Sequence, residues 1–316
     1  MSSRPARSTD PDRRAPGAAS SRLGRRSFLG GLAAGVLALG TSGCSTASKA
    51  GSLLDRSGLR PIALSYGPGT ARSGDLWLPL KRAAPRVGVV VLIHGGYWRP
   101  GFDRTLMSPL ARDLAGRGWA AWNIEYRATG EGGGWPGTFL DVAAAVDHLT
   151  TLAGPHRLDL DRIAVVGHSA GGTLALWTAG RAKLPAGAPG AGPAVRPAIV
   201  VSQAGINNLI AGVFEALDGD AVSSFMGADP KAAGDRYSLA SPTELLPLGV
   251  PQVIEYATAD TIVPSDQATA YAGKAQRAGD EVTLVPVRTS DHRALIDPSR
   301  PGWSQVKARL ADVLDD

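Results

Sequence analysis

Apolar residues occur in short continuous runs between segments with helical spacing, from about residue 60 to the end of the chain. The runs lie at 87–93, 119–126, 163–166, 199–202, 253–257 and 282–287. The segments with helical spacing lie at 105–116, 138–152, 173–179, 267–278 and 303–314. Continuous apolar runs are typical of strands buried on both faces, and their alternation with helices indicates repeated β-α-β units. The sequence therefore predicts an α/β fold, with a mostly parallel central sheet and helices on both faces.

One domain accounts for all of these elements. Residues 60–316 are long enough to bury a single large α/β core. Residues 44–59 are small and polar, as expected of a tether, and 186–197 is rich in Ala, Gly and Pro, as surface loops are. Residues 205–247 form an insertion between two predicted strands, which we expect to cap the ligand site or to pack as a peripheral element. In such a sheet, ligands bind at the carboxyl ends of the strands.

The positive charge of the chain is confined to its first part. The 316 residues carry a formal net charge of +5, and residues 1–43 contain seven arginines and two aspartates. The rest of the chain therefore has equal numbers of basic and acidic side chains. The sequence pI of about 9.5 gives no reason to expect a nucleic acid or an anionic membrane surface as a partner.

Residues 1–43 have the features of an export signal. The segment RRSFL at 25–29 resembles a twin-arginine motif, and the apolar stretch 28–40 is 13 residues long, shorter than the ~20 residues of a membrane span. The segment TSGC at 41–44 resembles a lipoprotein processing site, although Thr41 stands where Leu is usual. We expect twin-arginine export and a lipid anchor on Cys44 at the outer face of the membrane, or else secretion after plain cleavage. Because Cys44 is the single cysteine, no intrachain disulfide is expected.

The segment GHSAG at 167–171 lies between a predicted strand and a predicted helix. A G-x-S-x-G segment in this position indicates a nucleophile elbow, a tight turn that holds a serine hydroxyl above the end of the sheet. Its flanking positions need glycine because the turn leaves no room for larger side chains. Ser169 is the candidate nucleophile. The backbone N–H of Ala170, at the start of the helix, is expected to stabilise a developing oxyanion.

A serine hydroxyl needs a base, and the base needs an orienting carboxylate. Among the five histidines, His292 follows the last predicted strand, where the base of such a site is expected. Asp260 lies in the turn after the preceding strand and is the candidate acid. Asp291 and Asp266 are the alternatives. The order Ser169, Asp260, His292 along the chain is the order found in α/β-hydrolases.

A second glycine-rich segment, HGGYW at 94–98, follows the predicted strand at 87–93. Glycine lets the backbone approach a substrate closely, and an H-G-G segment after a strand supplies N–H donors to an oxyanion hole. His94 is expected to brace this loop rather than to transfer a proton. The expected oxyanion donors are Gly95, Gly96 and Tyr97, together with Ala170.

Side chains near these segments are candidates for the walls of a substrate pocket. The candidates are Tyr97, Trp98, His168, Phe214 and Phe225. For Tyr97 and Trp98, packing in the core is the alternative. The sequence contains no apparent cluster of metal ligands and no phosphate-binding loop, so neither a metal nor a cofactor is expected.

The chain resembles α/β-hydrolases of the esterase group that includes kynurenine formamidases and hormone-sensitive-lipase-like esterases. The similar segments are HGGYW at 94–98, NIEYR at 123–127, WPG at 135–137 with Asp141, GHSAGG at 167–172 and DTIVP at 260–264. The resemblance implies the α/β-hydrolase fold, a Ser/Asp/His triad and hydrolysis of a carboxylic ester or an aryl formamide. Export argues against kynurenine formamidase activity itself, because that substrate is an intracellular tryptophan catabolite.

The sequence therefore predicts an exported serine hydrolase that cleaves a small-molecule ester through an acyl-enzyme. A small amidase or exopeptidase would use the same three residues and is the enzymatic alternative. A cell-envelope lipoprotein that keeps the fold and only binds its ligand is the alternative from a different class. Contact with the membrane is expected through the lipid anchor only, and the sequence leaves the oligomeric state open.

Overall fold

The computed structural model describes residues 58–81, 84–288 and 290–315. The chain divides into two units, Met1–Ser52 and Leu53–Asp316, and all described residues belong to the second. The predicted signal segment 1–43, Cys44 and the tether up to residue 57 lie outside the described residues. Within the described ranges, no helix has both the length and the apolar character that a membrane crossing requires.

Eight strands of the described chain form one sheet in the order β1-β2-β4-β3-β5-β6-β7-β8. The strands are β1 (Ile62–Ser65), β2 (Ser73–Trp77), β3 (Val87–Ile93), β4 (Ala120–Ile124), β5 (Leu158–His168), β6 (Ile199–Gln203), β7 (Gln252–Ala257) and β8 (Val282–Val287). β3 to β8 are parallel, whereas β2 pairs antiparallel with both β1 and β4. The predicted mostly parallel sheet is confirmed.

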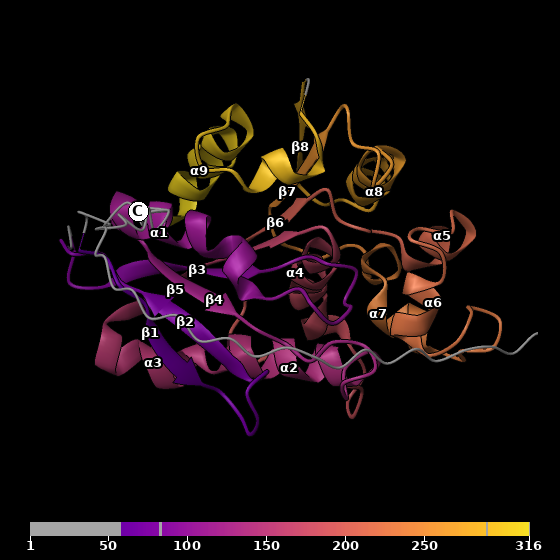
Figure 1. The fold of residues 1–316 in the computed structure, drawn as a ribbon, viewed down its shortest axis with the longest axis horizontal. Coiled ribbons are helices and arrows are strands. Elements are labelled where there is room, and N and C mark those ends of the chain that lie inside the picture. Colours follow the sequence, from indigo (N-terminus) through magenta and orange to yellow (C-terminus); the bar gives the residue numbers. More distant parts are fainter. Residues whose placement is uncertain (1–57, 82–83, 289, 316) are drawn as a thin grey trace, which may run out of the picture. The chain divides into compact units, whose positions relative to one another are not determined.

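Helices cover both faces of this sheet (Figure 1). They are α1 (Ser108–Arg117), α2 (Gly137–Asp147), α3 (Leu149–His156), α4 (Ala170–Gly180), α5 (Leu209–Phe214), α6 (Ala221–Met226), α7 (Arg236–Ala240), α8 (Asp266–Arg277) and α9 (Pro301–Leu314). The 3₁₀ helices are η1 (Arg104–Met107), η2 (Arg181–Lys183), η3 (Pro242–Leu245) and η4 (His292–Ile296). Buried side chains of α1 and α9 form one core, and those of α2, α3, α4 and α8 contribute to the other.

The central strand β3 shows why its sequence is a continuous apolar run. All seven of its residues are buried. Val89, Val91 and Ile93 contribute to one core, and Val90 and Leu92 contribute to the other. Successive side chains of a strand point to opposite faces, so a strand with a core on each side needs apolar residues at every position.

The sequence prediction missed β1 and β2. Most residues of β1 are exposed, and β2 contains Gly74 and Asp75 within five residues, two residue types that are depleted in strands. Both strands lie at the antiparallel edge of the sheet. Neither strand therefore shows the apolar run that marked the parallel strands.

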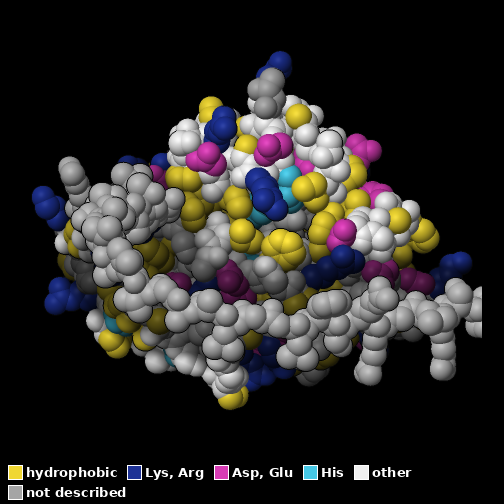
Figure 2. Space-filling view, viewed as in Figure 1, with side chains coloured by type: hydrophobic (Ala, Val, Ile, Leu, Met, Phe, Trp, Pro, Cys, Tyr) yellow, Lys and Arg dark blue, Asp and Glu magenta, His cyan; other side chains and the backbone are white. Residues whose placement is uncertain are grey.

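Two other parts differ from the predicted elements in detail. The helical segment at 138–152 forms two helices, α2 and α3, which meet at His148. His148 itself keeps right-handed helical angles, so the interruption is small. The insertion at 205–247 folds into the short helices α5, α6 and α7 and the 3₁₀ helix η3. On the face shown in Figure 2, basic and acidic side chains are interspersed among hydrophobic ones, in keeping with the balanced charge of this part of the chain.

Candidate active site

Ser169 occupies a sharp turn between β5 and α4. Its backbone has φ 54° and ψ −124°, a combination that non-glycine residues rarely adopt. The Ser169 N–H donates a hydrogen bond of 2.8 Å to the carbonyl oxygen of Gln203 at the end of β6. This bond ties the turn to the neighbouring strand. The surrounding structure thus maintains a backbone conformation that costs about 1–3 kcal/mol.

The two glycines of the GHSAG segment are required by close packing. A Cβ atom on Gly167 would lie 2.0 Å from the carbonyl oxygen of Gly171, and one on Gly171 would lie 2.2 Å from the carbonyl oxygen of Ile93. Both contacts are with backbone atoms, which cannot rotate away as a side chain can. The spacing of the glycines therefore follows from the shape of the turn, as the sequence predicted.

His292 and Asp260 contact each other at the carboxyl end of the sheet. Asp260 follows β7, and His292 opens η4 after β8. The Nδ1 atom of His292 lies 2.7 Å from Oδ2 of Asp260. The other oxygen, Oδ1, accepts hydrogen bonds from the backbone N–H groups of Ile262 and Val263, at 2.8 and 3.0 Å. A carboxylate held by three donors is fixed in position and orients the imidazole ring.

The ionisation of Asp260 follows from these contacts. Burial alone would raise the pKa of Asp260, but the hydrogen bonds from His292 and from the two backbone N–H groups hold it below its ordinary value of 3.8. Asp260 is therefore a carboxylate at neutral pH. Because the carboxylate accepts the Nδ1 proton, a neutral His292 has its Nε2 atom free to take up a proton.

The two alternative acids lie elsewhere. Oδ1 of Asp291 accepts a hydrogen bond of 2.9 Å from the N–H of Ala294 and so caps η4. Asp266 is the first residue of α8 and lines a different cavity. Among the three aspartates considered from the sequence, the structure brings Asp260 against the imidazole of His292.

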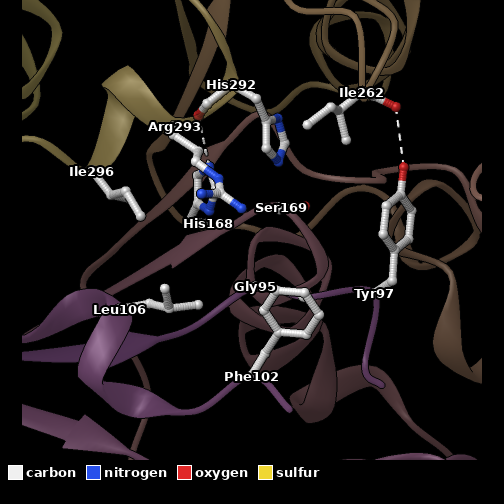
Figure 3. Close-up of a pocket in the computed structure, with 11 residues that line it drawn as sticks. Gly95, Tyr97, Phe102, Leu106, His168, Ser169, Ile262, His292, Arg293 and Ile296 are labelled. Carbon is white, nitrogen blue, oxygen red and sulfur yellow. Dashed lines mark hydrogen bonds between the residues drawn. The ribbon is translucent and has the colours of Figure 1, made fainter. Parts of the chain in front are cut away.

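Ser169 and His292 line the same cavity, which has a volume of about 170 Å³. In Figure 3 the imidazole of His292 extends into the cavity toward Ser169. His168, the residue before Ser169, connects the turn to η4, because its Nε2 donates a hydrogen bond of 2.9 Å to the carbonyl oxygen of His292. Burial, and then the adjacent His292, lower the pKa of His168 to about 3. His168 is therefore a neutral side chain that holds η4 against the elbow.

The loop after β3 passes directly over the nucleophile. A Cβ atom on Gly95 would lie 2.9 Å from the Cβ of Ser169. No hydrogen bond within the described residues uses the backbone N–H of Gly96 or Tyr97. Ala170 begins α4, and the first N–H groups of a helix have no acceptor within it. Gly95, Gly96 and Tyr97 line the same cavity as Ser169, and Ala170 follows Ser169 directly at the start of α4.

His94 braces this loop from behind. Its Nδ1 lies 2.8 Å from the carbonyl oxygen of Gly95, and its Nε2 lies 2.8 Å from Oε1 of Glu125. The ring stacks on Tyr126 with a centroid separation of 4.2 Å. With both nitrogen atoms engaged and the side chain buried, His94 is placed to support the loop, as the sequence analysis expected.

Three of the five predicted pocket residues lie away from the cavity. Trp98 and Phe225 are buried and stack on each other with a centroid separation of 3.9 Å, so both belong to the core. Phe214 is 74% exposed and does not line the cavity. For these three residues the prediction was wrong. The observed lining consists of Gly95, Gly96, Tyr97, Phe102, Leu106, His168, Ser169, Ile262, His292, Arg293 and Ile296.

The insertion at 205–247 contributes no residue to that lining. It contacts the loop above the site from outside, through an ion pair of 2.6 Å between Arg99 and Asp218. Phe225 of α6 also packs under this loop, against Trp98. In this structure the insertion supports the β3 loop and does not form a wall of the cavity.

A buried polar pair beneath η4 is absent from the sequence prediction. Glu255 of β7 is fully buried, and Gln203 donates hydrogen bonds to its Oε2 at 2.7 Å and to the carbonyl oxygen of Leu295 in η4 at 2.9 Å. The Oε1 atom of Glu255 has no partner within the described residues. Burial raises the pKa of Glu255 to about 7, although the hydrogen bond from Gln203 lowers it. The only signal in the sequence is one acidic residue inside an apolar run.

We expect this carboxyl group to make the stability of the protein depend on pH. The folded protein holds the Glu255 proton up to about pH 7, whereas the group ordinarily releases it near 4.5. The folded state thus binds more protons in this interval, and the Glu255 contribution to the free energy of unfolding falls as the pH rises from about 4.5 to 7. Glu255→Gln is expected to gain stability relative to wild type across this interval, by up to about 3 kcal/mol.

Urea denaturation at a series of pH values measures this effect. Glu244→Gln, at an exposed position, is the control and should follow the wild-type profile. If the difference between Glu255→Gln and wild type were the same at pH 4.5 and at pH 8, Glu255 would not be the group responsible.

The mostly parallel sheet, the sharp turn at Ser169 and the residues gathered at the carboxyl ends of the strands define an α/β-hydrolase fold. A model of the family described as BD-FAE matches residues 75–274, which is more than half of the chain. The chain belongs to the BD-FAE family. The matched range contains Ser169 and Asp260 and ends before His292.

Individual proteins are similar to this chain as well. The probable carboxylic ester hydrolase LipM of Mycobacterium tuberculosis is 36% identical over 116 residues, which are 35% of this chain and 26% of that protein. The match thus spans about a quarter of its length. A truncated carbohydrate esterase from gut microbiota has a TM-score of 0.68 at 19% identity, covering 81% of this chain and 97% of the other. A bacterial heroin esterase has a TM-score of 0.61 at 24% identity, covering 81% and 82%. At these sequence identities, both comparisons show a similar fold and nothing more specific.

Proposed function

We propose that this chain is a serine hydrolase that cleaves small carboxylic esters through Ser169, His292 and Asp260. The observation that carries the proposal is the 2.7 Å contact between His292 Nδ1 and Asp260 Oδ2, beside a cavity that both Ser169 and His292 line. A strained serine, an oriented imidazole and free backbone N–H groups are the three parts that acyl transfer requires.

The reaction begins when Ser169 attacks the ester carbonyl. Nε2 of His292 takes the hydroxyl proton as the oxygen of Ser169 forms its bond to the carbonyl carbon, and Asp260 stabilises the imidazolium that results. The N–H groups of Ala170 and of the Gly96–Tyr97 loop donate to the oxyanion. When the tetrahedral intermediate breaks down, His292 returns the proton to the leaving alcohol, and the acyl group stays on Ser169. Water then releases the acid by the same steps.

The walls of the cavity favour a small substrate with apolar parts. Phe102, Leu106, Ile262 and Ile296 contribute apolar side chains to the cavity that contains Ser169, and a cavity of about 170 Å³ accepts a short acyl or aryl group. The relative in Mycobacterium tuberculosis is named as a carboxylic ester hydrolase. An ester is therefore the preferred substrate over an aryl formamide or a peptide amide. Within the described residues no group of His, Cys, Asp and Glu side chains is arranged to hold a metal ion.

Labelling with a fluorophosphonate probe tests the proposal, because this reagent reacts covalently with an activated serine. We expect one label per chain, located on Ser169 by peptide mass spectrometry. A panel of 4-nitrophenyl esters, aryl formamides and amino-acid anilides then identifies the bond that is cleaved. A chain that neither takes the label nor hydrolyses any compound would support a binding lipoprotein instead.

We propose further that the enzyme is exported by the twin-arginine route and anchored by a lipid on Cys44. The support comes from the RRSFL segment at 25–29, the short apolar stretch 28–40 and the small residues before Cys44. A processed lipoprotein carries several acyl chains, and two or more chains hold a protein on a membrane where one does not.

Two variants test the location. Replacing both Arg25 and Arg26 with Lys is expected to block export, since the route recognises the arginine pair and not only its charge. Cys44→Ser is expected to give soluble or unprocessed protein, whereas the wild type fractionates with membranes. Mass spectrometry of the mature N-terminus is the deciding measurement. An unmodified terminus beyond Cys44 in the wild type would contradict the anchor.

A further inference from the structure

Among the described residues, Arg293 is the one permanently charged side chain that lines the cavity. It follows His292 in η4, and in Figure 3 its guanidinium group extends past His168 toward Ser169. The space-filling view shows a basic side chain next to histidine atoms, with hydrophobic side chains and one acidic side chain nearby (Figure 2). A permanent positive charge therefore borders the same cavity as Ser169.

No protein carboxylate neutralises this charge within the described residues. Arg293 has no ion pair and no hydrogen bond there, and no Asp or Glu of the described chain lines the cavity. Asp291, two residues earlier, uses its carboxylate to cap the N–H of Ala294. Asp297, four residues later, accepts hydrogen bonds from Ser299 and pairs with Arg300. The acids nearest along the chain are thus engaged elsewhere.

Two other arginines near the site, unlike Arg293, form ion pairs with aspartates. Arg99, on the loop above the site, pairs with Asp218 at 2.6 Å. Arg104 of η1 pairs with Asp75 at 3.0 Å. An arginine that lines a cavity without such a partner has its five N–H donors available for a ligand.

We propose that Arg293 determines specificity by binding a carboxylate on the substrate, so that the preferred esters are monoanions. This inference rests on the proposed esterase function. A guanidinium matches a carboxylate with two parallel N–H···O bonds. One arginine balances one negative charge, and no second Lys or Arg from the described ranges lines the cavity, which favours a carboxylate over a phosphate dianion. The apolar side chains of Leu106 and Ile296, on the same side of the cavity in Figure 3, suit the carbon chain between the two groups.

The carboxylate can belong to the acyl part or to the alcohol part of the ester, and two pairs of substrates separate these cases. The first pair is 4-nitrophenyl hexanoate and the 4-nitrophenyl half-ester of adipic acid, in which a carboxylate replaces the terminal methyl group. The second pair is phenyl hexanoate and 3-carboxyphenyl hexanoate. For each pair the measured quantity is the ratio of kcat/KM for the anionic ester to that for the neutral ester.

Arg293→Gln is expected to lower this ratio at least tenfold in one of the two pairs, and Arg293→Lys is expected to retain part of it. The control Arg277→Gln, at an exposed position on α8, should keep the wild-type ratios. Because Arg293 is exposed, the wild-type ratio should also fall with rising salt concentration.

Equal losses for anionic and neutral esters in Arg293→Gln would overturn the inference, since Arg293 would then act on the geometry of His292 and not on substrate charge. A ratio that stays within twofold of wild type in both pairs would overturn it as well. Either result leaves the esterase function standing if Ser169→Ala abolishes hydrolysis of the neutral esters. A wild type that hydrolyses none of the four esters would overturn the proposed function and this inference together.

Discussion

Ser169→Ala is expected to lower kcat for ester hydrolysis by about 10⁴-fold or more and to leave the folded structure intact. The acyl-enzyme cannot form without the hydroxyl, and the loss of a triad nucleophile has effects of this size. The Ser169 side chain makes no hydrogen bond to the described residues, and its backbone bond to Gln203 does not depend on the hydroxyl. Alanine is also small enough for the turn.

The measurement combines steady-state kinetics on 4-nitrophenyl butyrate with a thermal melt of each variant. Ser304→Ala, which removes an exposed hydroxyl on α9, is the matched control and should show wild-type kinetics. If Ser169→Ala kept more than about 1% of wild-type turnover, a level far above the loss expected for a nucleophile, another residue would have to be the nucleophile.

Asp260→Asn should give the second largest effect, a fall in kcat of about 10³–10⁴-fold. An amide in this place can donate a hydrogen bond to Nδ1 and so stabilise the imidazole tautomer that carries its proton on Nε2. That tautomer cannot accept the proton of Ser169. The amide also lacks the negative charge that stabilises the imidazolium of His292, whereas the carboxylate lies 2.7 Å from Nδ1.

Asp291→Asn is the matched comparison, since Asp291 is adjacent to His292 but points its carboxylate at Ala294. Asparagine also caps helices well, so we expect a change in stability below about 1 kcal/mol and little change in kcat. A pH–rate profile of both variants on a neutral ester tests the assignment. A large fall in kcat for Asp291→Asn with a small one for Asp260→Asn would mean that the acid is misplaced.

The sequence predicted those parts of the molecule where one residue type is dictated by local geometry. The parallel strands were found because burial on both faces requires apolar residues at every position, as in β3. The elbow was found because Gly167 and Gly171 touch backbone atoms. The residues Asp260 and His292 were found because chemistry in a parallel sheet gathers at the carboxyl ends of its strands.

The cavity walls were not predictable in the same way. Phe102 and Leu106 come from one part of the chain, Ile262 from a second and Ile296 from a third. An apolar residue outside the strands has the same local sequence pattern whether it meets the substrate or the core. Trp98 is a residue that the sequence placed among the pocket candidates and that the structure places in the core. It is next to a predicted oxyanion donor, yet its ring is turned into the core to stack on Phe225. Whether such a side chain faces the cavity or the core depends on the tertiary structure and not on the local sequence.

Glu255 was missed for a related reason. A single acidic residue in a strand usually indicates a solvent-facing position, because burial of a charged carboxylate is costly. In this protein its neighbours across the sheet include Gln203, whose amide donates to the carboxyl oxygen. The partner lies 52 residues away in the sequence, and no local pattern links the two.

The left-handed backbone of Ser169 has a consequence for directed evolution. At φ 54° and ψ −124°, glycine is the residue type that fits the turn with the least strain. Selection for thermal stability alone therefore acts against the proposed nucleophile and favours the inactive substitution Ser169→Gly. A library built on this scaffold must therefore be screened for turnover and heat resistance in the same round. Otherwise the most heat-resistant clones will carry Ser169→Gly, which removes the backbone strain at this position and also removes the catalytic hydroxyl.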